Sequence, residues 1–130
     1  MEARGEFEVT MIPADESPAE APIGRFRLDK TYHGPLTGSS EGQMLTHRTA
    51  VQGSAGYTAL ERVTGTLDGR SGSFVLLHYG EMTKGTPTKW GVSVVPDSGT
   101  DELVGLKGDL EIVMEGGKHE YVLRYELADE

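Results

Sequence analysis

The sequence contains no cysteine, which excludes disulfide bonds and thiolate chemistry and leaves the redox compartment undetermined. It also lacks any apolar run near the roughly 20 residues of a membrane-spanning helix, so we expect no membrane partner. The N-terminal stretch MEARGEFEVTMIP has no apolar segment of signal-peptide length. We therefore expect a cytoplasmic location.

Positive charge is scarce, with 12 Lys and Arg against 21 Asp and Glu and a formal net charge of −9. No basic cluster offsets this charge locally, and an acidic surface repels a phosphate backbone, so we expect no nucleic-acid partner. The four histidines, His33, His47, His78 and His119, do not have a spacing typical of metal ligands. We predict no metal and no other cofactor.

No segment has the 3.6-residue apolar stripe of an amphipathic helix; strand-like alternation is present instead. Apolar and polar residues alternate over 5–13, 23–34, both halves of 59–80, 89–96 and 119–127. Two further segments, 36–50 and 103–115, are also predicted to be extended. The proline-rich segment 13–22 predicts a loop. A single domain, 1–130, with about eight short strands predicts an all-β fold, a closed antiparallel barrel.

Five stretches carry a family resemblance: GEFEV, LDKTYHGPLTGSSEGQML, YTALERVTGTLDGRSGSFVLLHYG, VVPDSGTDELVGLKG and HEYVLRYEL. In this order they cover nearly the whole chain, which resembles the bacterial domain of unknown function 3224 family, with its allene oxide cyclase-like barrel. Departures are slight: the family often has Gln at Leu77 and Gly at Asp97 and Asp101. The resemblance implies a closed, usually self-associated barrel without an established activity. Allene oxide cyclases, dirigent proteins and some cofactor-free polyketide cyclases are wider relatives of the fold.

The hairpin at 59–80 contains a carboxylate and an imidazole, Glu61 and His78. If Asp68-Gly69 forms a two-residue type I′ turn, Glu61 faces Leu76 and lies diagonally next to His78 on the inward face. A three-residue loop would shift the register by one residue and separate the pair. Two interpretations stay open: a catalytic acid/base pair, or a hydrogen-bonded pair that ties two strands across the core.

Further inward positions are candidates for a ligand site. Lys30 alternates in phase with Phe26, Leu28 and Tyr32, so it either enters the barrel and balances Glu61 or extends from the rim to solvent. We predict that the ligand-binding residues are Tyr57, Phe74, Trp90, Tyr125, Lys30 and Met44. Ordinary core packing is the alternative for each of the apolar ones.

The leading functional hypothesis is a barrel that binds a small apolar molecule, with cofactor-independent isomerase or cyclase chemistry at Glu61 and His78. The alternative is a non-catalytic structural or protein-interaction barrel with a filled core, and the sequence does not decide whether the protein is an enzyme. A ligand site needs about 300 Å³ or more of concave space. Val75, Leu77 and Tyr79 are expected on an outward apolar patch, which predicts a homo-oligomer.

Overall fold

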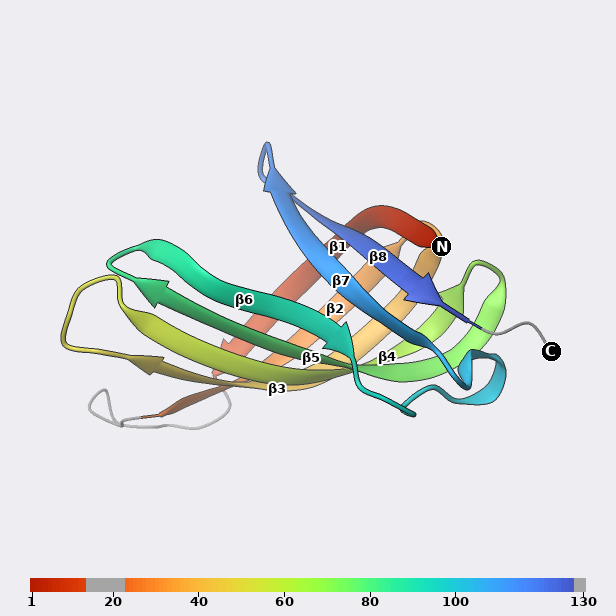
Figure 1. Cartoon of the computed structure of the whole chain (residues 1–130), viewed down its shortest axis with the longest axis horizontal. Helices are drawn as coiled ribbons and strands as arrows, with labels where there is room; N and C mark the ends of the chain where they lie inside the picture. The colour runs from red at the N-terminus through yellow and green to blue at the C-terminus, as the bar shows by residue number, and fades with distance from the viewer. Residues whose placement is uncertain (14–22, 128–130) are drawn as a thin grey trace.

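The computed structural model describes residues 1–13 and 23–127, in which eight strands close into an antiparallel barrel in chain order (Figure 1). The strands are β1 (Glu2–Pro13), β2 (Gly24–His33), β3 (Leu36–Arg48), β4 (Ala55–Leu67), β5 (Arg70–Thr83), β6 (Thr86–Val94), β7 (Lys107–Glu115) and β8 (Lys118–Glu126). This arrangement confirms the predicted fold. Beyond Pro13, the predicted loop lies outside the described residues.

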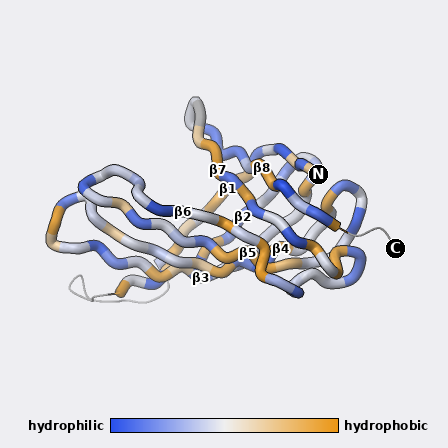
Figure 2. The backbone as a smooth tube through the Cα atoms, viewed as in Figure 1, coloured by the Kyte–Doolittle hydropathy of each residue, from blue (hydrophilic) through white to orange (hydrophobic). Residues whose placement is uncertain are grey.

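Tight turns set the register of the strands. Asp68 and Gly69 both have positive φ, 47° and 87°, as a type I′ turn requires. Leu67 therefore pairs with Arg70, and Glu61 pairs with Leu76. The predicted two-residue turn and its register are confirmed, and apolar and polar residues alternate along the strands (Figure 2).

The segment before β7 departs from the expected strand at 103–115. Residues Asp101–Leu103 form one turn of 3₁₀ helix, and β7 begins only at Lys107. The turn brings Leu103 and Leu106 into the core, where each is 1% exposed. Burial of these two side chains outweighs the local alternation, so the prediction of a strand at 103–106 was wrong. No helix among the described residues is long and apolar enough to span a membrane.

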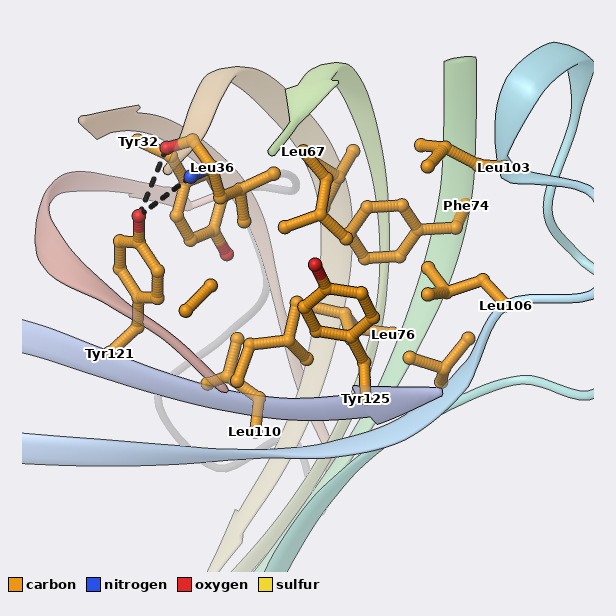
Figure 3. Close-up of a cluster of buried hydrophobic side chains, with 14 of the residues drawn as sticks. Tyr32, Leu36, Leu67, Phe74, Leu76, Leu103, Leu106, Leu110, Tyr121 and Tyr125 are labelled. Atoms are coloured by element: carbon orange, nitrogen blue, oxygen red, sulfur yellow. Dashed lines mark hydrogen bonds between the residues drawn. The ribbon is translucent and has the colours of Figure 1, made fainter. Parts of the chain in front are cut away.

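One end of the barrel is filled by a continuous apolar core (Figure 3). Its largest fully buried side chains include Tyr32, Phe74 and Tyr121. The Tyr121 hydroxyl lies 2.8 Å from the carbonyl oxygen of His33 and accepts a hydrogen bond from the Leu36 amide at 3.0 Å, which fixes the β2–β3 turn over this end. The core therefore closes the end of the barrel that holds the β4–β5 turn.

The loop after β6 completes the wall at the filled end. The Val95 amide donates to the Val75 carbonyl at 2.8 Å, and the Thr100 amide donates to the Ser73 carbonyl at 2.9 Å. These bonds occupy the edge of β5 that β6 does not reach. The loop thus replaces a strand where the barrel would otherwise have an unpaired edge.

The opposite end is open. In the described strands, β6 and β7 are joined by a single register pair, Ser93 with Asp109. The β7–β8 hairpin diverges from β6 beyond that pair (Figure 1). A barrel that is filled at one end therefore widens into a mouth at the other.

The outer face of β3, β4 and β5 carries exposed apolar side chains at Leu45, Leu60, Leu77 and Tyr79, 45%, 54%, 39% and 40% exposed. Leu60 stands directly across from Leu77 in the sheet. Val75, expected in the same patch, is half-buried. We call Leu45, Leu60, Leu77 and Tyr79 the outer patch.

The outer patch leads us to retain the prediction of a homo-oligomer, because burying it between copies would remove apolar surface from water. Light scattering at micromolar concentration is expected to give a multiple of the 14.0 kDa chain mass. The double substitution Leu60→Asp and Leu77→Asp is expected to lower that mass to one chain, whereas Thr64→Asp on the same outer face serves as control. A wild-type mass of one chain would contradict the prediction.

Candidate functional site

A buried carboxylate at the centre of the barrel is held by four side chains. Glu61 is 1% exposed. Its Oε1 accepts hydrogen bonds from the Tyr32 hydroxyl at 2.8 Å and lies 3.2 Å from His78 Nε2. Its Oε2 accepts from the Ser40 hydroxyl at 2.9 Å and lies 3.0 Å from Lys30 Nζ. We call these five residues the Glu61 network.

Strand register brings the network together. Lys30 on β2 pairs with Ser40 on β3, and Ser40 pairs with Val63 on β4, two residues from Glu61 on the same inward face. His78 on β5 stands across from Ala59, two residues from Glu61 in the other direction. The predicted proximity of Glu61 and His78 is confirmed. Of the two alternatives left open for Lys30, the structure shows the first, because its side chain enters the barrel and lies beside Glu61.

Electrostatics make Glu61 a stable anion. Burial alone would raise the pKa of this carboxyl, but the hydrogen bond with His78, the Lys30 charge and the Tyr32 hydroxyl together lower the pKa to about 2. Burial and the nearby Glu61 charge raise the pKa of Tyr32 well above its usual value of 10.0. Lys30 Nζ also lies 5.1 Å from the centre of the Phe7 ring. At neutral pH Glu61 is ionised and Tyr32 is protonated.

A cavity of about 1420 Å³ occupies the open end of the barrel. Inward-facing apolar side chains of several strands line it, including Met11, Phe26, Met44, Tyr57, Trp90 and Val92. Charged side chains of both signs line it as well, among them Arg48, Lys89 and Glu81. The cavity and the filled core thus divide the barrel interior between its two ends.

The predicted ligand-binding residues separate into two groups. Tyr57, Trp90 and Met44 line the cavity, and Trp90 is 67% exposed. Phe74 and Tyr125 lie in the filled core instead. Alternation showed that these aromatic residues face inward, but it does not show which end of the barrel they occupy.

Two predicted ligand-binding residues that do not line the cavity, Lys30 and Tyr125, have a structural role instead. Lys30 belongs to the Glu61 network and not to the cavity wall. The Tyr125 hydroxyl donates to the Asp68 carboxylate at the β4–β5 turn, and burial together with this bond raises the pKa of Tyr125 to about 12.

Sequence reasoning missed two members of the network. Tyr32 alternates in phase with Lys30, and this pattern indicates that the Tyr32 side chain points inward. The hydrogen bond of Tyr32 to Glu61, however, depends on the distance between β2 and β4 across β3. Ser40 gave no signal, because an isolated serine in a glycine-rich strand has no distinctive pattern. Within the described residues, no three His, Asp or Glu side chains group closely enough to hold a metal ion.

Comparison with known proteins places the chain in one family. Residues 3–125 match the family model described as a protein of unknown function, DUF3224. The chain is similar to the crystal structure of a protein with unknown function from the DUF3224 family of Shewanella oneidensis MR-1, with 42% identity and a TM-score of 0.90. That match covers 100% of this chain and 98% of the other. No curated protein matches the chain. By the extent of the family match and the identity over the full barrel, this chain belongs to the DUF3224 family.

Proposed function

We propose that the barrel binds a small apolar molecule in the cavity at its open end. The observation that carries this proposal is the cavity itself, whose volume of about 1420 Å³ exceeds the few hundred Å³ of a typical ligand pocket. Its wall is largely apolar, and Trp90 and Tyr57 offer ring faces to a ligand. A purely structural barrel gains nothing from an unfilled apolar interior at one end.

The Glu61 network supports binding more strongly than it supports catalysis by Glu61. A carboxylate with a pKa of about 2 is a weak base at neutral pH. Its oxygens already accept bonds from Tyr32, Ser40 and His78 and contact Lys30. We therefore assign Glu61 the role of holding its neighbours in place. Isomerase or cyclase chemistry at Glu61 and His78 has less support.

Binding can be tested with N-phenyl-1-naphthylamine, an uncharged fluorophore that brightens in apolar surroundings. We expect saturable enhancement with the wild-type protein. Ala55→Phe adds a ring to the cavity wall and is expected to weaken binding by about tenfold or more, since it fills space that the fluorophore needs. The matched control is Thr64→Phe, which places the same ring on the exposed outward face of β4.

Unchanged affinity in Thr64→Phe together with the loss in Ala55→Phe supports the cavity as the site. No enhancement with the wild-type protein contradicts the proposed function. Equal affinities in both variants would place the fluorophore elsewhere on the surface and would also contradict it.

A further inference from the structure

The rim of the open cavity carries a cation at an inward position of a strand. Met44, Thr46 and Arg48 occupy successive inward positions along β3, and all three line the cavity. Every second side chain of a strand points to the same face, so Arg48 shares the direction of the other two. Arg48 is also the last residue of β3, at the end of the strand opposite the filled core. It therefore belongs to the rim.

Cross-strand register places Arg48 in a row of four lining residues. Arg48 stands beside Ala55 on β4, and Ala55 stands beside Met82 on β5. Met82 in turn stands beside Pro87 on β6, and all four residues line the cavity. The rim row thus combines one cation with three apolar neighbours.

The rows below the rim are aromatic and apolar. Tyr57 and Trp90 belong to the next row, on either side of β5, and Phe26 stands beside Met44 one row deeper. All four line the cavity. A strand rises about 3.3 Å per residue, so Arg48 and Met44 are separated by about 13 Å along β3. An apolar body of that length fits below a polar group held at the rim.

Arg48 differs from the other charged residues of the cavity wall. Lys89 Nζ lies 5.9 Å from the centre of the Tyr79 ring in the outer patch, and Glu111 accepts a hydrogen bond from Arg124 at 3.2 Å. The other titratable residues of the described wall, all at outward positions, are Arg25, His47, Glu81, Lys89, Asp109 and Glu111. Arg48 points inward and has no hydrogen bond or ion pair with any described residue. Its guanidinium is therefore available to an anion.

We propose that the ligand of this cavity is an amphiphile, an apolar body that ends in a carboxylate, and that Arg48 binds the carboxylate at the rim. This inference rests on the proposed function and names its ligand class. A guanidinium matches a carboxylate with two parallel hydrogen bonds. The net charge of −9 repels anions from the surface as a whole, so an anionic ligand depends on a local, unpaired cation.

The test compares decanoate with 1-decanol, which has the same number of carbons and no charge, at about pH 8, where a carboxyl group is ionised. Trp90 is the single tryptophan of the chain and lines the cavity, so its fluorescence reports occupancy by either compound. Arg48→Gln is expected to weaken decanoate binding by about 3- to 5-fold, the size of a solvent-accessible ion pair, and to leave 1-decanol binding unchanged. Arg48 is exposed, so this substitution leaves the core intact.

The matched control is Arg4→Gln, which makes the same change in net charge. Arg4 is an exposed residue of β1 beside Ala3 of the filled core, away from the cavity, and its substitution is expected to change neither affinity. A second variant, Arg48→Glu, reverses the charge at the rim. It is expected to weaken decanoate binding by about tenfold or more and to strengthen binding of decyltrimethylammonium, because like charges repel and opposite charges attract.

The outcomes separate the two proposals. Equal decanoate affinities in wild type and Arg48→Gln, with 1-decanol still bound, overturn the role of Arg48 and leave the proposed function standing. An equal loss for 1-decanol in Arg48→Gln, or an equal decanoate loss in Arg4→Gln, also overturns that role, because the effect then does not come from a local ion pair. Binding of neither compound to the wild-type protein contradicts both proposals.

Discussion

Replacement of Glu61 by glutamine is expected to lower the free energy of unfolding by about 3–5 kcal/mol, although the two side chains have nearly the same shape. Lys30 Nζ lies 3.0 Å from Glu61 Oε2, and the lysine side chain is 6% exposed. An amide at position 61 leaves this ammonium buried without its counter-charge. The amide also presents a nitrogen where Tyr32, Ser40 or His78 now donates to an oxygen.

Urea unfolding of four proteins measures this effect: wild type, Glu61→Gln, Lys30→Met and the double variant. We expect the double variant to recover most of the stability that Glu61→Gln loses, because it removes both charges together. Glu41→Gln, an exposed glutamate on β3, serves as the control and is expected to change stability by no more than about 0.5 kcal/mol. A loss below about 1 kcal/mol in Glu61→Gln would show that the buried charge pair does not hold the barrel as described.

Acid is expected to remove about 3 kcal/mol of stability through Glu61 alone. The pKa of this group falls from its usual 4.5 to about 2 in the folded protein. A carboxyl whose pKa is lowered on folding stabilises the protein fully above the unfolded-state value, and that stabilisation is lost as the pH falls toward the folded-state value. The loss therefore occurs between about pH 4.5 and pH 2, and this pKa difference sets its size.

The double variant Lys30→Met and Glu61→Gln is the matched reference for this measurement. It has the same net charge as the wild-type protein at neutral pH, and it keeps all carboxylates other than Glu61. Free energies of unfolding are compared at pH 6 and at pH 2. The wild-type protein is expected to lose about 3 kcal/mol more than the double variant over this range. Parallel pH profiles for the two proteins would refute the assignment of a lowered pKa to Glu61.

The sequence alone determined the fold class and the register of its central hairpin. Alternation with period two identifies strands, because successive side chains of a strand point to opposite faces. Asp68-Gly69 provides the two positive φ angles of a type I′ turn, and that turn fixes Glu61 opposite Leu76. The meeting of Glu61 and His78 follows from this local chemistry, since both residues belong to one hairpin.

Only the tertiary structure decided which residues from distant strands contact Glu61 and His78, and which end of the barrel is hollow. Tyr32 and Ser40 reach Glu61 because β2, β3 and β4 pair in one register, which no local pattern encodes. Alternation gives the face of a side chain but not its height along the barrel axis, so Phe74 and Trp90 are alike in sequence terms. Phe74 is buried in the core, because the chain after β6 closes that end of the barrel. Trp90 lines the cavity, because β6 and β7 pair only at Ser93 and Asp109 and separate toward the other end.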